Sequence, residues 1–415
     1  MDLYTLITLL IVTAALFAYL NTRFLKLPDA IGIMVVSVSF SLFFIAVHSV
    51  RPELFTLARE TVASIDFNWV LFDVMLSFLL FAGAFHTNVA LLRVERRSVI
   101  LFAFVGVLLS TALVGTGLYY LAAWLGFGLS YPLCLLFGAL ISPTDPIAVL
   151  GILARFRLPD SVKLNIVGES LFNDGVGVVV FASIYRIVLG GSGSSVSPGE
   201  IGLLFLEEAG GGLLYGLALG YGMYRLLRSI NHYQTEVMLT VAGVMGGSLL
   251  AQQLHVSGPL AMVVAGLFVG DRARHYAMSD QTEEYVDKFW ELIDIILNAL
   301  LFVLIGVELL IIDFDSSYWL ISILSIVLVL VCRYIAIWLP YRLARPWLTL
   351  DNKAPIMMTW GGLRGGISVA LALSISNEVP DKNLIVAITY VVVLFSVIGQ
   401  GLTLERLIQR LYRGI

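Results

Sequence analysis

Apolar stretches long enough to cross a lipid bilayer recur along nearly the whole chain, and they constrain its fold more than any other feature. A membrane-spanning helix needs about 20 mostly apolar residues. On that basis we predict thirteen spans, with approximate limits 2–22, 30–48, 68–86, 98–124, 132–153, 162–189, 200–227, 234–254, 258–270, 285–311, 316–341, 354–376 and 383–404. Residues 51–67 are expected to form an interfacial loop or a partial helix.

The composition supports a membrane location. Only 13% of the 415 residues are charged and 59% are hydrophobic, whereas ordinary globular chains carry about 25% charged residues. So little charge cannot cover a soluble surface, and we predict an all-α integral membrane protein. The net charge of −4 gives no indication of the basic surface that nucleic-acid-binding proteins carry. The two cysteines, Cys134 and Cys332, lie in apolar runs, and neither a phosphate-loop nor a zinc motif occurs, so no cofactor or nucleotide is expected.

Positive charge alternates between the loops that join the spans. If the N-terminus lies outside, the inner loops and span ends collect nineteen of the 25 lysines and arginines, and the outer ones collect four. The other two, Arg333 and Arg364, fall within spans. The positive-inside rule therefore predicts an outer N-terminus and a cytoplasmic C-terminus. Residues 1–20 contain no Lys or Arg, so we read them as a retained span and not as a cleavable signal peptide.

Several ionisable residues lie at membrane depth, where charge is unfavourable and functional candidates concentrate. Four of them lie toward span ends and are assigned an interfacial or structural role: Asp73, Glu291, Asp294 and Glu308. Five lie deeper and are the candidates for function: Asp145, Glu169, Asp174, Arg333 and Arg364.

The fifth span contains two prolines three residues apart, in the segment 142–146 (SPTDP). Each proline removes a backbone donor and disfavours α geometry in the residue before it. The segment therefore predicts a broken helix around Thr144 and Asp145. Broken helices occur in membranes where they line a cavity or a binding site.

The sixth span carries the segment 168–175 (GESLFNDG). At 100° per residue, Glu169, Ser170, Asn173 and Asp174 fall within about 140° of one helix face. All four supply oxygen ligands, which hard cations prefer, and no His or Cys accompanies them. We interpret this face as a cation site.

The twelfth span carries four glycines around one arginine, in the segment 361–366 (GGLRGG). Glycines destabilise a helix interior and allow close backbone approach. The breaks in spans 5 and 12 occupy matching places in the triplets 4–6 and 11–13, which run in opposite senses. Paired interrupted helices of this kind indicate a secondary transporter built from inverted repeats.

These three segments resemble the signature segments of the cation:proton antiporter-1 family, which includes prokaryotic NhaP-type sodium/proton antiporters and animal sodium/proton exchangers. The resemblance runs through the membrane unit in order, and the chain's end at Ile415 favours the prokaryotic branch. It implies a homodimer in the cell membrane. It also implies an ion-transporting core (98–189 and 316–404) and a dimerisation domain (1–97 and 200–311). Gly212, Gly216 and Gly220 could serve either packing within the protomer or the dimer contact.

The resemblance also implies the roles of individual residues. Asp174 would be the essential sodium- and proton-binding carboxylate, with further ligands from Asp145, Thr144, Ser170 and Glu169. Asn173 would steady the broken helix, and Arg364 or Arg333 would neutralise Glu169; of these two we prefer Arg364. Because only Asp174 would titrate, we expect electroneutral exchange of one sodium ion for one proton by alternating access. A potassium or lithium antiporter, a sodium-coupled symporter and a channel are the competing hypotheses.

Overall fold

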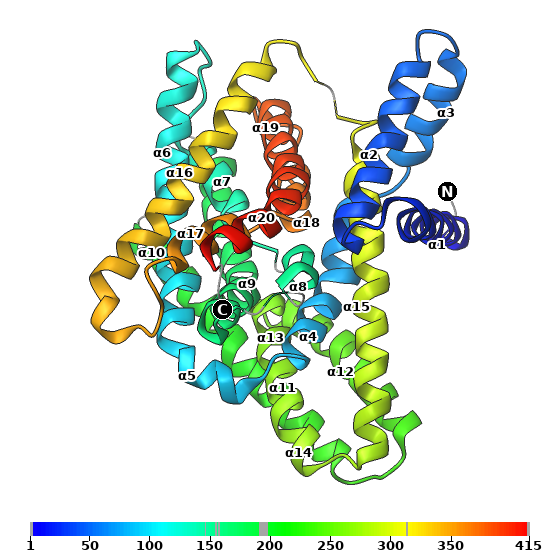
Figure 1. Ribbon diagram of the computed structural model, residues 1–415, viewed down its shortest axis with the longest axis vertical. Coiled ribbons are helices and arrows are strands. Elements are labelled where there is room, and N and C mark those ends of the chain that lie inside the picture. Colours follow the sequence, from blue (N-terminus) through cyan, green and yellow to red (C-terminus); the bar gives the residue numbers. More distant parts are fainter. Residues whose placement is uncertain are drawn as a thin grey trace.

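The computed structural model describes residues 3–145, 147–153, 156, 158–190, 198–312 and 314–412. Pro146 and residues 191–197, part of a segment rich in Gly and Ser, lie outside these ranges. Throughout the described part the chain forms helices and no strand, which confirms the all-α prediction (Figure 1). Seven of these helices are long and apolar enough to cross a membrane, and shorter apolar helices accompany them.

The helices follow one another along the chain, with short π- or 3₁₀-helical stretches (η) that mostly continue a neighbouring helix. The first part contains α1 (Leu3–Leu20), η1 (Asn21–Leu25), α2 (Asp29–Val47), α3 (Pro52–Ala63), η2 (Trp69–Met75), α4 (Leu76–Phe85), α5 (Val89–Ile100), η3 (Leu101–Gly106), α6 (Val107–Trp124), α7 (Tyr131–Ile141), α8 (Ile147–Leu153) and α9 (Asp160–Gly190). The second part contains α10 (Pro198–Phe205), η5 (Leu206–Gly210), α11 (Gly211–Leu227), α12 (Tyr233–Gln253), α13 (Gly258–Phe268), η6 (Val269–Ala273), α14 (Arg274–Tyr276), α15 (Asp280–Glu308), α16 (Tyr318–Ala344), η7 (Arg345–Trp347), α17 (Ala354–Gly361), α18 (Gly366–Leu373), α19 (Lys382–Leu394), η8 (Phe395–Gln400) and α20 (Gly401–Leu411).

Each predicted span coincides with one of these helices or with a helix interrupted where the sequence predicts a break. The segment 51–67 contains the partial helix α3, which begins with a proline at its first position, a favourable place for it. The fourth span starts earlier than predicted, at Val89 instead of residue 98. Asn88 caps this helix by accepting a hydrogen bond from Leu91 N (3.1 Å). The first part of the helix was not predicted because the charged residues within 93–97 lower its hydropathy.

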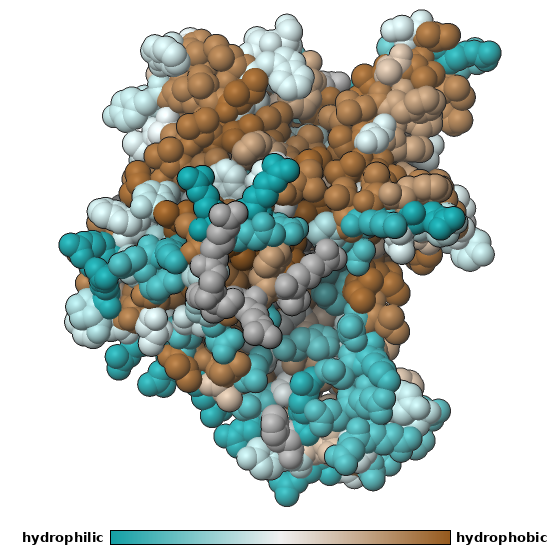
Figure 2. Space-filling model, viewed as in Figure 1, coloured by the Kyte–Doolittle hydropathy of each residue, from teal (hydrophilic) through white to brown (hydrophobic). Residues whose placement is uncertain are grey.

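Helices from distant parts of the chain pack side by side. Helix α16 lies along α6 and α19, while α15 runs as a long rod from α14 toward α2 (Figure 1). Apolar side chains dominate the upper part of the surface in Figure 2, and hydrophilic ones gather at the opposite end around α14 and the start of α15. An amphipathic division of this kind fits a membrane-embedded body with a polar end.

The glycines of α11 pack inside the protomer. A Cβ on Gly216 would lie 2.6 Å from the carbonyl oxygen of Ala261 in α13, and one on Gly212 would lie 2.7 Å from that of Ser257. Gly220 similarly faces Phe268. Of the two roles left open by the sequence, the structure therefore supports packing of α11 against α13.

A separate apolar cluster surrounds this contact. It joins side chains of α4, α11, α12, α13 and α15. Trp290 is fully buried in the cluster, 4.7 Å from Phe81 between ring centroids, and its Nε1 donates to Thr240 Oγ1 (3.1 Å). The larger cluster holds the helices that carry the two breaks.

Candidate functional site

The two interrupted helices meet at their breaks. The first break separates α7 from α8, and the second separates α17 from α18. Asp145 N donates a hydrogen bond to Leu363 O (2.7 Å), which forms an isolated antiparallel bridge between the two segments. Gly365 makes this approach possible, because a Cβ there would lie 2.5 Å from Asp145 Oδ2. The proline-containing segment 142–146 and the glycine-containing segment 361–366 thus cross to form one shared site.

Each break supplies a charge to a helix end created by the other. The Asp145 side chain lies against Gly365 at the start of α18, where a negative charge is favoured by the helix dipole. Arg364 Nη1 donates to the carbonyl oxygens of Ser142 and Pro143 (3.0 Å to the latter), just beyond the end of α7. Carbonyls left without helical partners are thereby satisfied in the protein interior.

Helix α9 holds the first break in place through two side chains. The Asn173 amide accepts a hydrogen bond from Thr144 N (3.2 Å) and donates one to Thr144 Oγ1 (2.8 Å). It therefore binds both the backbone and the side chain of the unwound segment. Ser170 Oγ donates to Thr144 O. These contacts tie Asn173 to the backbone and hydroxyl of Thr144, and Ser170 to its carbonyl oxygen.

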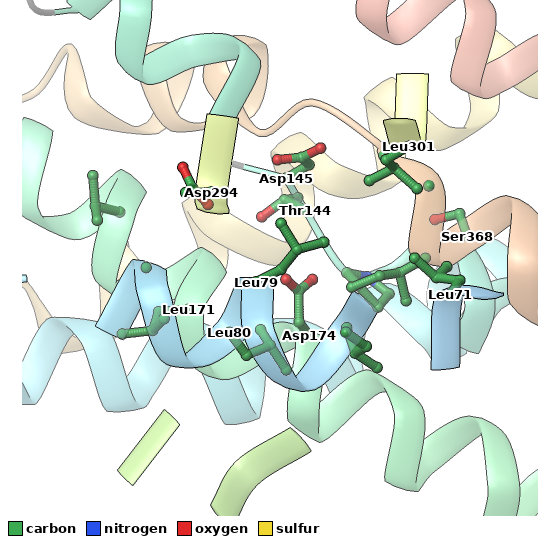
Figure 3. Close-up of a pocket in the computed structure, with 17 residues that line it drawn as sticks. Leu71, Leu79, Leu80, Thr144, Asp145, Leu171, Asp174, Asp294, Leu301 and Ser368 are labelled. Atoms are coloured by element: carbon green, nitrogen blue, oxygen red, sulfur yellow. The ribbon is translucent and has the colours of Figure 1, made fainter. Parts of the chain in front are cut away.

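A cavity of about 100 Å³ opens beside the crossing (Figure 3). Its polar lining comes from Thr144, Asp145, Asp174, Asp294 and Ser368, and the remaining lining is apolar or glycine. Among the described residues no Lys, Arg or His lines it. Asp174 is 7% exposed, so its carboxylate faces this small space and little else. Carboxylate and hydroxyl oxygens in a cavity without a basic group suit a hard cation or a proton.

Glu169 does not line this cavity. Its Oε1 lies 2.6 Å from Arg333 Nη1, and both side chains are 2% exposed. Glu169 and Asp174 lie about 140° apart around the helix, so one carboxylate faces α16 while the other faces the cavity. The expectation that Glu169 is a direct ligand is corrected accordingly: the geometry makes it the charge partner of an arginine.

That arginine is Arg333, and the preference for Arg364 was wrong. Gly362 lets the Arg333 guanidinium approach, since a Cβ at this glycine would lie 2.9 Å from Arg333 Nη2. Arg364 instead stabilises the end of α7 as described above. Both arginines are buried, at 1% and 2% exposure, but only one is within ion-pair distance of Glu169 among the described residues.

Two lining residues were missed by the sequence reasoning. Asp294, assigned an interfacial or structural role, lines the cavity from α15. Ser368 lies in the first turn of α18, and its buried Oγ has no hydrogen-bond partner among the described residues. The signal for Ser368 was its place just after the glycine break. The signal for Asp294 was an acidic residue four positions before Asn298, and so on the same helix face, in the predicted span 285–311.

Comparison with known proteins identifies the family. A family model described as sodium/hydrogen exchanger, transmembrane, matches residues 11–410. The chain belongs to this family. It is 47% identical to the Na⁺/H⁺ antiporter NhaP of Pseudomonas aeruginosa over 99% of this chain and 97% of the relative. It is 35% identical to the Na⁺/H⁺ antiporter NhaH of Halobacillus dabanensis, with 94% and 93% coverage.

The fold also matches a solved structure. The sodium proton antiporter MjNhaP1 of Methanocaldococcus jannaschii superposes with a TM-score of 0.74 at 21% identity, covering 97% of each chain. The family and the antiporter architecture predicted from the sequence are therefore confirmed.

Proposed function

We propose that this chain exchanges sodium ions for protons across the cell membrane, with Asp174 as the group that carries either ion. The observation that carries the proposal is the Asp174 carboxylate, buried beside two crossing helix breaks in a cavity whose described lining contains no basic side chain. The names of the curated relatives support sodium as the exchanged cation.

The exchange follows from competition for one carboxylate. A sodium ion needs the ionised form of Asp174, and a bound proton removes that negative charge, so the two ions exclude each other. Asp145 supplies a further oxygen, directly or through water. Thr144 contributes its hydroxyl or its carbonyl oxygen. Ser170 Oγ donates to that carbonyl in the structure. Its hydroxyl would rotate, either to leave the carbonyl oxygen available or to bind the ion itself. Movement of the loaded site then exposes it alternately to the two sides, and no nucleotide is required.

Electroneutral exchange follows from the other groups on α9. Asn173 is a neutral amide engaged with Thr144, and it carries no second proton. Glu169 is paired with Arg333 and does not line the cavity, so we assign it no exchanging proton. One sodium ion therefore exchanges for one proton.

We further propose that residues 98–189 and 316–404 form the moving core, and that residues 1–97 and 200–311 form the dimerisation domain of a homodimer. The separate apolar cluster around Trp290 supports this division, because its fully buried members come almost entirely from the second set of residues. The distribution of Lys and Arg supports an outer N-terminus and a cytoplasmic C-terminus.

The test uses purified protein in sealed liposomes with an internal pH dye. Addition of external sodium should drive protons out of the lumen, with no response to choline. Parallel additions of lithium and potassium rank the three cations, and a response to potassium alone would replace sodium by potassium in the proposal. Failure of any alkali cation to move protons would contradict antiport and favour a symporter or a channel.

A further inference from the structure

A second cavity lies beside the first, on the other side of Asp294. Its volume is about 420 Å³, and it is lined from α1, η1, α2, α8 and α15. Asp294 lines both cavities, and it is the one described residue that does. Figure 3 shows it at the edge of the first cavity, together with Thr144, Asp145 and Asp174. A cation that travels between the two cavities would therefore pass this carboxylate.

An amide oxygen with no partner lies one turn further along α15. Asn298 lines the second cavity and is 5% exposed. Its Nδ2 donates to Asp294 O (2.8 Å), which fixes the amide so that Oδ1 is left without a hydrogen-bond partner among the described residues. A buried acceptor left in this state is unfavourable unless a passing ligand satisfies it. Residues four apart share a helix face, and Asn298 and Asp294 line the second cavity from the same side of α15.

The charge of the second cavity fits a cation. Asp29, at the start of α2, lines it, and no Lys, Arg or His does so among the described residues. Clefts lined by one sign of charge concentrate ions of the opposite sign and raise their rate of entry. The second cavity thus brings Asp29 and Asn298 into one lining with Asp294, which also lines the cavity of the proposed binding site.

We propose that Asp294 and Asn298 form a transfer step, where a sodium ion is held briefly between the second cavity and Asp174. The inference rests on the proposed sodium/proton exchange. Asp294 belongs to α15, in the proposed dimerisation domain, whereas Asp174 belongs to the proposed core. A sodium ion at Asp294 is therefore still held by the proposed dimerisation domain and has not yet bound to the moving core. Asp294 contacts the ion before the core is loaded in this account, and its carboxylate sets how readily sodium reaches the site.

The proposed orientation places the second cavity on the cytoplasmic side, because Asp29 follows the loop that holds Arg23 and Lys26. The test therefore compares everted membrane vesicles, in which this side faces the bath, with right-side-out vesicles. Asp294→Asn should raise the apparent KM for sodium about tenfold in everted vesicles. Its maximal rate should fall less than its KM rises, and its KM should change little in right-side-out vesicles. Asn298→Leu should shift the KM in the same direction.

The matched control is Glu291→Gln, which removes the same charge from an exposed position on the same helix; its KM should equal that of the unmodified protein. Added choline chloride should raise the KM of the unmodified protein toward that of Asp294→Asn, because salt screens charge. An unchanged KM in Asp294→Asn, an equal shift in Glu291→Gln, or loss of exchange even at saturating sodium would overturn the transfer step. If the unmodified protein moves no protons, the proposed function fails instead.

Discussion

Glu169 and Arg333 place one full charge of each sign in the interior, where neither is exposed by more than 2%. Removing two charges from water is expensive, and their attraction repays this cost only when the pair is intact. The pair therefore fixes the relation of α9 to α16 more than it adds stability. It also engages Glu169, so that Asp174 is the carboxylate of α9 that faces the cavity.

We predict that breaking this pair destabilises the protein. Glu169→Gln or Arg333→Ala should each cost about 3–5 kcal/mol, because the remaining charge is left buried and uncompensated. Thermal unfolding in detergent gives the change, and a double-mutant cycle gives the coupling. Glu169 should couple strongly to Arg333 and weakly to Arg364. A larger coupling to Arg364 would contradict the assignment.

We propose that exchange depends on Asp174. Asp174→Asn should reduce sodium-driven proton movement to background while the protein remains folded, because an amide cannot exchange a proton for a cation. Asp160→Asn, an exposed substitution in the first turn of the same helix, should retain exchange. Near-normal transport by Asp174→Asn in liposomes would show that another group carries the ions.

At the scale of elements, the contact between α11 and α13 depends on a missing side chain. Gly216→Ala would place a methyl group 2.6 Å from a backbone carbonyl oxygen, and such overpacking costs about 1–3 kcal/mol. The melting temperature should therefore fall. Gly222→Ala, on the same helix with no atom within 4 Å of the added Cβ, should leave it unchanged or raise it. Equal effects of the two substitutions would argue against this packing.

The elements and their breaks could be predicted because they depend on local properties. Apolar length identifies the spans, prolines identify the break before Asp145, and glycines identify the break around Arg364. The charged start of α5 was missed, because a hydropathy count does not register a capped, polar helical turn. Periodicity also placed Glu169, Ser170, Asn173 and Asp174 on one arc without saying what each would face.

The partners of those side chains could not be predicted, because they depend on how distant helices pack. Arg333 and Arg364 are equivalent by sequence, and only the crossing of α16 and α9 pairs the first with Glu169. Asp294 looked interfacial, since its position in the span says nothing about which cavity α15 borders. Two cavities that share one residue are a property of the assembled fold.

At the scale of the whole molecule, the arrangement determines how many charges cross the membrane in a cycle. Asp145 and Asp174 both line the site, and we propose that Asp174 alone exchanges its ion while Asp145 supplies a ligand oxygen. Glu169 is paired, Asn173 is neutral, and Asp294 lies on the other side of the proposed domain boundary. On this proposal, a sodium ion moving one way and a proton moving the other leave no net charge transferred.

Voltage dependence tests this claim most directly. Each net charge moved would couple to the membrane potential by about 2.3 kcal/mol per 100 mV. Exchange by the unmodified protein in liposomes should therefore keep the same rate under potassium/valinomycin potentials of either sign. It should also produce no sustained current on a solid-supported membrane. A rate that changes with the potential, or a current that outlasts ion binding, would show that a second group titrates and would contradict single-carboxylate exchange.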